Sequence, residues 1–446
     1  MLYIVVKWII RLTLNSYFRK IAITGHRYIP AKGPVIFVAN HPSAFMDPMV
    51  VATCIGRSIH FLSAAEFFGT GIKSWFYQKY LNMIPVYRRS ILPNETHNNE
   101  AIFSKCFELL HQGGAILVFP EGNSVTEKRI RKLKTGVARM AIGAREYSPS
   151  KVEVDIIPIG LNYGNPHRFQ SELFINIGKP LSISEFSSDA SEVVRLTNLV
   201  EERLKEIILH VQHESLDSIV KKVELILKSN FQNENKSASK KNEEFIFQQN
   251  VIKSIQTLSE HQPQLLADLE LKLDDYLRRI RNLGISDGSI AELSIFVSTK
   301  ELLQLILTFP LFLVGMIFNI IPYYTTIFYF RKLNLFSREG IEVPHKKVNQ
   351  AFKGSVAMSI GIVFFIAWYL ILGITGFWIT DIVWVGILLV IIFYLSGLFS
   401  MRYIRWFLLF KQKLKLRKLL QRNQQSFTSL IIERQKIIEA ITALIK

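Results

Sequence analysis

A histidine and an aspartate stand close together after a short apolar segment near the start of the chain. Residues 34–39 (PVIFVA) lead into Asn40 and His41, and five residues separate His41 from Asp47. An imidazole exchanges protons near neutral pH, and a carboxylate that holds one ring nitrogen leaves the other nitrogen to accept a proton. The pair is therefore a candidate general base with its orienting partner.

Both side chains also have structural interpretations. Asp47 precedes Pro48, and an aspartate followed by proline is typical of a helix N-terminus, with the aspartate as N-cap. His41 could equally be an ordinary buried histidine. This segment alone leaves both interpretations open.

Three further segments contain residues that suit the handling of a charged substrate. Arg88 follows segment 83–87, and its guanidinium could bind a phosphate bidentately or be a solvated surface group. Residues 118–124 (VFPEGNS) predict a strand that runs into a Pro-Glu-Gly turn. Residues 155–162 (DIIPIGLN) predict an apolar strand, and Pro158 within it indicates a bend or a sheet edge.

Strand-like and helix-like segments alternate through this part of the sequence. Such alternation predicts an α/β domain whose sheet is largely parallel, with flanking helices. The strand segments are almost wholly apolar, as expected of strands that are covered on both faces. The expected strands are 34–39, 59–62, 83–87, 115–119, 155–162 and 173–177, and the expected helices include 99–111 and 132–146.

These four segments, in their order and spacing, resemble the glycerolipid acyltransferase family. The resemblance covers about residues 25–180 and is most specific at block 119–122 (FPEG), followed by the asparagine-histidine block. Members of that family transfer a fatty acyl group from acyl-CoA or acyl carrier protein to glycerol 3-phosphate or 1-acylglycerol 3-phosphate. The resemblance implies the same O-acyltransferase reaction here, in phospholipid biosynthesis.

The family pattern implies a role for each matched residue. His41 is expected to be the general base, and Asp47 is expected to orient it. Arg88, Glu121 and Gly122 are expected to belong to the pocket for the acyl acceptor.

The implied chemistry needs no nucleophile from the protein. The acceptor's own hydroxyl would take the place of the serine in a Ser-His-Asp triad and lose its proton to His41 as it attacks the thioester carbonyl. The negatively charged acceptor needs a cationic group, which Arg88 could supply together with Lys134 or a basic residue of 128–131. No metal site is expected, and no cofactor beyond the acyl-carrying co-substrate.

Two departures from the family pattern bear on the site. The usual spacing places four residues between the histidine and the aspartate, whereas five stand here, so the turn must bulge for Asp47 to reach His41. Five residues also occur in a subset that resembles fungal glycerol 3-phosphate acyltransferases and has membrane segments after the catalytic domain. The arginine that usually follows the Glu-Gly is replaced by Ser124, so a downstream lysine or arginine is expected to substitute for it.

Charge and hydropathy are segregated along the chain. The 446 residues carry a net charge of +18, yet the mean hydropathy is positive, at +0.22. Three uncharged runs, 302–330, 355–378 and 382–401, have 29, 24 and 20 residues, and about 20 are needed to cross a bilayer as a helix. The chain is therefore predicted to be an integral membrane protein. Its basic segments are expected to contact anionic membrane lipids, and no nucleic acid is expected as a partner.

The flanks of these runs predict their orientation. Segments 331–354 and 402–422 carry six and eight basic residues and 379–381 carries none, so the second and third runs predict a hairpin with both ends in the cytoplasm. Acyl-CoA and acyl carrier protein are cytoplasmic, so the catalytic domain is expected on the same side. Because Pro310 and Pro322 interrupt the first run, that run is expected to be re-entrant or doubly crossing.

The sequence divides into five expected regions. The linker region includes 228–244, whose composition is typical of a flexible segment. The regions are an N-terminal interfacial helix (1–24), an acyltransferase domain (25–210), a helical and linker region (211–300), a membrane region (301–401) and a basic helical tail (402–446).

Two other functions stay open at this point. One is the acylation of another small lipid acceptor, and the other is a non-catalytic, lipid-binding membrane scaffold. The joint presence of His41, Asp47 and Glu121 favours an enzyme, because a scaffold needs none of them. The chain has only two cysteines, which excludes a disulfide framework and a cysteine-based zinc cluster.

Overall fold

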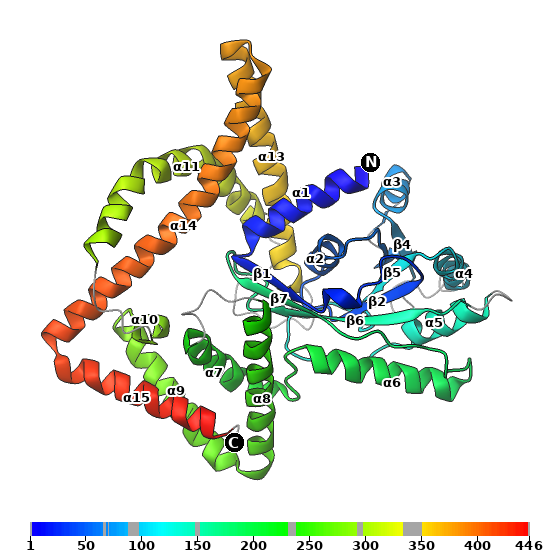
Figure 1. Cartoon of the computed structure of the whole chain (residues 1–446), viewed down its shortest axis with the longest axis horizontal. Helices are drawn as coiled ribbons and strands as arrows, with labels where there is room; N and C mark the ends of the chain where they lie inside the picture. Colours follow the sequence, from blue (N-terminus) through cyan, green and yellow to red (C-terminus); the bar gives the residue numbers. More distant parts are fainter. Residues whose placement is uncertain are drawn as a thin grey trace. The chain divides into compact units, whose positions relative to one another are not determined.

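A computed structural model describes residues 2–65, 68–69, 71–87, 98–147, 152–230, 238–291, 298–332 and 350–444. The chain divides into two compact units (Figure 1). Unit 1 comprises Met1–His210 and Asn334–Met358, and unit 2 comprises Val211–Leu333 and Ser359–Lys446.

Unit 1 is built around a seven-stranded sheet with the order β1-β7-β6-β2-β5-β3-β4. All neighbouring strands pair in parallel except β6 and β7, which are antiparallel. The largely parallel α/β fold expected from the sequence is therefore confirmed. The strands are β1 (Lys20–Thr24), β2 (Val35–Ala39), β3 (His60–Ala64), β4 (Met83–Val86), β5 (Ala115–Val118), β6 (Asp155–Tyr163) and β7 (Glu172–Ile177).

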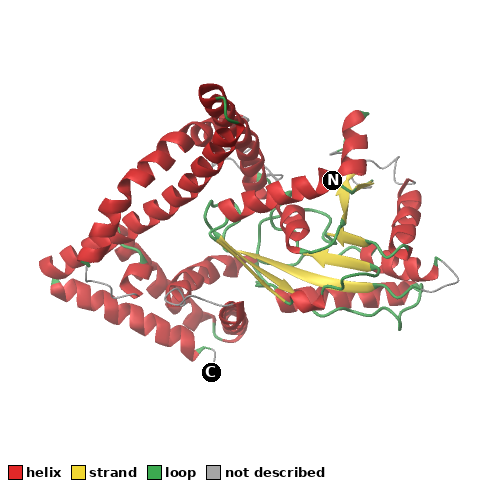
Figure 2. Cartoon of the chain, turned by 45° about the horizontal axis from the view of Figure 1, so that its top comes forward, coloured by secondary structure: helices red, strands yellow, loops and turns green. Residues whose placement is uncertain are grey.

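Helices cover both faces of this sheet, as Figures 1 and 2 show. One face carries α5 and α6, and the other carries α1 and α2. The central strand β2 is buried along its whole length because its apolar side chains meet helices on each face. The helices of unit 1 are α1 (Leu2–Tyr17), η1 (His26–Tyr28), α2 (Met46–Cys54), α3 (Ile72–Tyr80), α4 (Asn98–His111), α5 (Gly136–Glu146) and α6 (Ala190–Ile207).

The six expected strands are confirmed to within two residues at each end, and β1 is the strand that sequence reasoning missed. Segment 20–24 was expected to belong to the N-terminal helical region. The helix instead ends at Tyr17, and the Arg19 N–H donates to the Ser171 carbonyl, so the chain joins the edge of β7. The alternating pattern of residues 20–24 is too short for periodicity to distinguish a strand from the end of a helix.

Pro158 lies in an interior strand, so its expected position at a sheet edge is wrong. It faces Val38 in the parallel pair of β6 with β2. On the other side of β6, the strand β7 has just ended at Ile177, and the Gly178 N–H donates to the Pro158 carbonyl. The proline is tolerated because the neighbouring chain leaves the sheet where a strand partner would need the missing N–H.

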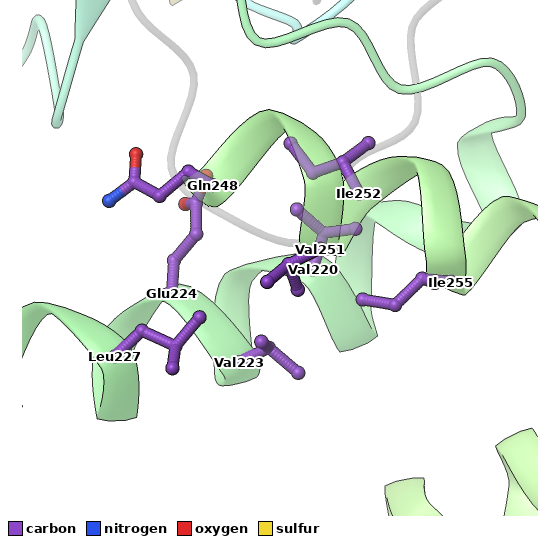
Figure 3. Close-up of a pocket in the computed structure, with 8 residues that line it drawn as sticks. All are labelled: Val220, Val223, Glu224, Leu227, Gln248, Val251, Ile252 and Ile255. Carbon is purple, nitrogen blue, oxygen red and sulfur yellow. The ribbon is translucent and has the colours of Figure 1, made fainter. Parts of the chain in front are cut away.

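Unit 2 is helical. The expected linker 228–244 is partly wrong, because α7 continues to Asn230 and α8 begins at Ala238, while 231–237 lie outside the described residues. The two helices pack through apolar side chains that include Val220, Val223 and Ile255 (Figure 3). The helices are η4 (Glu214–Leu216), α7 (Asp217–Asn230), α8 (Ala238–His261), α9 (Pro263–Asn282), α10 (Asp287–Ala291), α11 (Thr299–Lys332), α13 (Lys353–Thr380, starting in unit 1), α14 (Val383–Arg422) and α15 (Gln424–Ala443).

Three of these helices are long and apolar enough to cross a membrane. They are α11, α13 and α14, and they contain the three uncharged runs of the sequence except Ile382, the N-cap of α14. Many of their large apolar side chains are exposed, as expected of surfaces that face lipid rather than a protein core. The structure thus agrees with membrane association of the chain.

Helix α11 runs toward the α13–α14 turn and then away from it. Its first half follows α14, where the Tyr403 hydroxyl donates to the Leu305 carbonyl (3.2 Å) and the Asn319 amide donates to the Phe393 carbonyl (3.1 Å). Its second half follows α13 toward that helix's start, where the rings of Tyr329 and Phe364 stack. Both ends of α11 therefore lie on the side away from the turn, and Figure 1 shows the helix as bent.

The bend in α11 coincides with Pro322, which has no backbone N–H, and another donor takes the place of that N–H. Pro322 cannot donate to the carbonyl of residue 318, and an unpaired carbonyl in a membrane is costly. The Trp368 indole N–H donates to that Phe318 carbonyl at 2.8 Å. The carbonyl that the proline leaves without its helical donor is thereby paired.

The contact of α11 with α14 depends on a glycine, and this predicts a contrast between two Gly→Ala variants. A Cβ at Gly315 would lie 2.1 Å from the Ser396 carbonyl oxygen, whereas a Cβ at Gly361 would meet only Thr326 Cγ2 at 3.7 Å. Because the carbonyl cannot move away, we expect Gly315→Ala to lower the Tm of the detergent-purified chain by about 5 °C or more.

The matched control is Gly361→Ala, which should leave the Tm within about 2 °C of the parent because alanine also favours helix. Equal melting temperatures for the two variants would contradict this packing of α11 on α14.

Candidate active site

His41 and Asp47 meet at the carboxyl end of β2. His41 Nδ1 lies 2.8 Å from Asp47 Oδ2. The Asp47 side chain is fully buried, and the His41 side chain is 18% exposed. Because a carboxylate accepts and cannot donate, Nδ1 carries the ring proton of a neutral His41, and the lone pair is on Nε2. The arrangement presents a base with one free nitrogen.

The extra residue between the two side chains is absorbed by a left-handed turn. Ala44 has φ +41°, which is unusual for a residue with a Cβ. The Ser124 hydroxyl holds it there by accepting from the Ala44 N–H at 2.7 Å. The turn brings Asp47 into the first turn of α2, whose N-cap is Phe45. The interpretation of Asp47 as the helix N-cap is therefore wrong.

Asp47 is held by three donors. Besides His41 it accepts from the Ser43 N–H at Oδ2 (2.8 Å) and from the Tyr163 hydroxyl at Oδ1 (2.7 Å). Burial raises the pKa of Tyr163 well above its ordinary value, and the Asp47 charge raises it further, so the hydroxyl keeps its proton and donates. Three donors stabilise a carboxylate in a site that water does not reach.

Sequence reasoning missed Tyr163. It is the last residue of β6, one position beyond the recognised segment 155–162. Parallel strands β2 and β6 are neighbours, so their carboxyl ends meet at the same edge of the sheet. A tyrosine at the end of a strand beside the histidine strand is the signal that could have identified it.

The His41 ring is also fixed by stacking. It lies against the Phe119 ring with a centroid distance of 4.1 Å and an interplanar angle of 17°. Phe119 directly follows β5, the other neighbour of β2. The ring is thereby held in orientation on its face as well as at Nδ1, which restricts the direction in which Nε2 points.

Glu121 is occupied by protein donors. Its Oε1 accepts from the His41 backbone N–H (3.0 Å), and its Oε2 accepts from the Arg131 backbone N–H (3.3 Å) and Nε–H (3.2 Å). Burial raises the pKa of the Glu121 carboxyl, and the Arg131 guanidinium opposes this. Glu121 therefore joins the loop that contains His41 (residues 40–45, the histidine loop) to the basic loop 125–135.

Lys134 lies over Gly122. Gly122 has φ +75°, and a Cβ at this position would lie 2.4 Å from Lys134 Nζ. The Lys134 backbone N–H donates to the Pro120 carbonyl, so the lysine is anchored to the same turn. Arg131 is paired with Glu121, whereas among the described carboxylates none forms an ion pair with Lys134. The turn thus presents an ammonium group over Gly122, the residue after Glu121.

The structure brings together five of the six site residues expected from the sequence: His41, Asp47, Glu121, Gly122 and Lys134. Arg88 lies outside the described residues. The strand before it, β4, is parallel to β3 in the same sheet and ends at Val86. Within the described ranges, no group of three or more metal-ligating side chains gathers at a common point.

Comparison with known proteins defines the class of this domain. Residues 20–162 match the family model described as Acyltransferase. This range contains strands β1 to β5 and nearly all of β6, together with His41, Asp47, Glu121 and Lys134. The α/β domain therefore matches the acyltransferase family over these residues, as the sequence motifs predict.

Individual relatives place the resemblance within glycerolipid synthesis. The chain is 26% identical to glycerol-3-phosphate O-acyltransferase 1 of Saccharomyces cerevisiae, over 41% of this chain and 35% of that protein. It is 26% identical to the 1-acyl-sn-glycerol-3-phosphate acyltransferase of Borreliella burgdorferi, over 50% of this chain and 80% of that protein. The chain thus spans about a third of the length of the yeast relative.

A solved structure also matches part of the chain. It is the crystal structure of the 1-acyl-sn-glycerophosphate acyltransferase from Thermotoga maritima, with 23% identity and a TM-score of 0.34. The match covers 45% of this chain and 77% of that one.

The basic loop beside the site depends on a neutral histidine, which predicts a pH effect on stability. The Ile130 N–H donates to His210 Nδ1 at 3.2 Å. Burial lowers the pKa of His210 to about 4 from 6.5. Between these values the unfolded chain binds more protons than the folded one, so stability falls as the pH decreases from 6.5 toward 4.

We expect the Tm of the purified chain to fall less steeply over this pH range in His210→Gln than in the parent. His213→Gln, which changes an exposed histidine of the same loop, is the control and should keep the parental slope. Identical slopes for all three proteins would contradict a neutral, buried His210.

Proposed function

We propose that this chain is a membrane O-acyltransferase of phospholipid biosynthesis. It moves a fatty acyl group from acyl-CoA or acyl carrier protein to the hydroxyl of glycerol 3-phosphate or 1-acylglycerol 3-phosphate. The observation that carries the proposal is the His41–Asp47 pair with a free Nε2 at the carboxyl end of β2. The acyltransferase family match and the names of the relatives support it.

The proposed reaction proceeds by direct attack of the acceptor on the thioester. His41 Nε2 accepts the proton of the acceptor hydroxyl as its oxygen forms a bond to the thioester carbonyl carbon. The tetrahedral intermediate then expels the thiolate, an ester remains, and the proton on His41 passes to the sulfur. Asp47 stabilises the imidazolium that exists between the two transfers. The thioester is already activated, so the proposal includes no metal or further cofactor.

Lys134 is the cation that we assign to the acceptor phosphate. Arg131 pairs with Glu121, so it contributes to the loop rather than to a substrate. The Lys134 ammonium lies over Gly122, in the turn whose Glu121 carboxylate contacts the histidine loop. A phosphate bound there would bring an acceptor hydroxyl toward the histidine loop. This lysine would substitute for the arginine that Ser124 replaces.

The proposal is tested with the purified full chain in lipid nanodiscs. Labelled acyl-CoA and labelled acyl carrier protein are each supplied with glycerol 3-phosphate, 1-acylglycerol 3-phosphate or dihydroxyacetone phosphate. We expect transfer to glycerol 3-phosphate or to its 1-acyl product, and a loss of about 100-fold or more in His41→Ala. We expect Lys134→Gln to raise the KM for the acceptor about tenfold with a smaller change in kcat.

His213→Ala is the matched control for loss of a histidine, and it should retain parental activity. Transfer only to dihydroxyacetone phosphate would favour the alternative of another small lipid acceptor. Absence of transfer to every acceptor, with an intact Tm, would favour the lipid-binding scaffold. Parental activity in His41→Ala would contradict the assigned base.

We further propose that the catalytic unit faces the cytoplasm and that α11 is re-entrant. The basic segments 331–354 and 402–422 support this orientation. The two halves of α11, which run toward and then away from the α13–α14 turn, support the re-entrant path. With this topology the chain before α11 and the segment after it lie on the side of acyl-CoA and acyl carrier protein.

Single cysteines in a background without Cys54 and Cys106 test this topology. In intact cells, we expect cysteines at residues 282, 340 and 446 to react with a membrane-impermeant maleimide only after the membrane is opened; Asn282 is exposed and precedes α11. A cysteine at Asp381, in the α13–α14 turn, is the control and should react in intact cells. Labelling of residue 282 from outside would overturn the proposed orientation.

A further inference from the structure

Several residues just before and within the first turns of the membrane helix α13 are buried in unit 1. Ala351 and Ser355 have no exposed surface, and Met358 is 4% exposed. These residues belong to the compact unit that contains the sheet and His41. A helix that contacts only lipid would not bury its first residues in the unit that contains the sheet. We call residues 351–358 the docking segment.

The docking segment contacts the loop from His41 to Asp47, which we call the catalytic loop, through two aromatic rings. Phe352 packs edge-to-face on Phe45, with a centroid distance of 5.2 Å. Phe45 is one of the five residues between His41 and Asp47, and it follows the left-handed residue Ala44. The loop between His41 and Asp47 therefore carries a ring that contacts the docking segment.

A chain of hydrogen bonds links the same two regions. The Gly354 N–H donates to His167 Nδ1 (3.3 Å), and His167 Nε2 lies 3.0 Å from the Thr126 hydroxyl. That hydroxyl donates to the Pro42 carbonyl at 2.8 Å. The directions are consistent for a neutral ring, because Nδ1 accepts from Gly354 and Nε2–H donates to Thr126 Oγ1.

The charge state of His167 agrees with these directions. Burial, together with the nearby charge of Lys353, lowers the pKa of His167 to about 4. The ring is therefore neutral near pH 7, as acceptance from the Gly354 N–H requires.

Close backbone approach fixes the position of the docking segment. A Cβ at Gly354 would lie 2.4 Å from the Pro166 carbonyl oxygen. That carbonyl also accepts from the Tyr17 hydroxyl at 2.9 Å, so the start of α13 and the end of α1 meet at one loop. Only glycine permits this close contact of residue 354 with the Pro166 carbonyl. Pro42, at which the hydrogen-bond chain ends, directly follows His41.

We propose that the docking segment positions the catalytic loop, so that His41 and Asp47 are held in working geometry by the beginning of the chain's own membrane hairpin. One contact acts through Phe45 and the other through Pro42, on either side of the turn between His41 and Asp47. The effect on catalysis rests on the proposed function, whereas the effect on the order of the loop does not. Phe352 is a positioning residue, since it contacts the loop and not the reacting atoms.

The first test measures loop order without reference to activity. Hydrogen exchange is followed in peptides that cover residues 41–47, in the full chain in nanodiscs. We expect exchange to be at least about fivefold faster in Phe352→Ala than in the parent, and Phe352→Leu to restore most of the protection. Phe377→Ala, on the same helix but outside the docking segment, is the matched control and should exchange like the parent. Parental exchange in Phe352→Ala would overturn the proposal.

The second test separates positioning from substrate binding. We expect Phe352→Ala to lower kcat about tenfold and to change the KM for the acceptor less than about twofold. The double variant Phe45→Ala with Phe352→Ala should be no worse than either single variant, because both remove the same contact. Additive losses, or a loss in KM alone, would contradict positioning. An inactive parent with faster loop exchange in Phe352→Ala would refute the proposed function and leave the docking segment in place.

Discussion

The buried carboxylate of Asp47 is the constraint on which the site depends. A charge without exposure to water is stable only if donors surround it, and here a backbone N–H, a tyrosine hydroxyl and the His41 ring supply them. Each donor comes from a different part of the fold, so the sheet, the turn and α2 must be in place together. The same carboxylate fixes the proton of a neutral His41 on Nδ1 and leaves the lone pair on Nε2, the atom that we propose as the base.

The rest of unit 1 follows from this requirement. Parallel strands deliver His41, Phe119 and Tyr163 to one edge of the sheet, and Glu121 joins the histidine loop to the basic loop that carries Lys134. The proposed chemistry needs a base beside a cation and no covalent intermediate, and this edge supplies both. The docking segment adds a third level of support, from the beginning of a membrane helix. The sheet and the first residues of α13 thereby belong to one compact unit.

Sequence reasoning was most successful where chemistry is local. His41 and Glu121 come two and three residues after apolar strands, and Asp47 is close to His41 in the sequence, so strand ends and residue types suffice to place them at one edge. It missed Tyr163, because a donor that arrives from another strand leaves no pattern beside Asp47. It also missed the docking segment, since the Gly354 and His167 that form a hydrogen bond are 187 positions apart. The start of α8 was taken for linker because its polar residues lack a clear apolar face, and packing on α7 stabilises the helix that follows.

The most direct test of the central claim is the activity of an Asp47→Asn variant that keeps the parental fold. Asparagine keeps the size of the side chain but can donate to Nδ1, which would move the ring proton to Nε2 and remove the base. With the Tm unchanged to within a few degrees, kcat/KM for acyl transfer is predicted to fall by about 100-fold or more. Activity within tenfold of the parent would contradict the claim that a buried carboxylate sets the tautomer of the catalytic histidine.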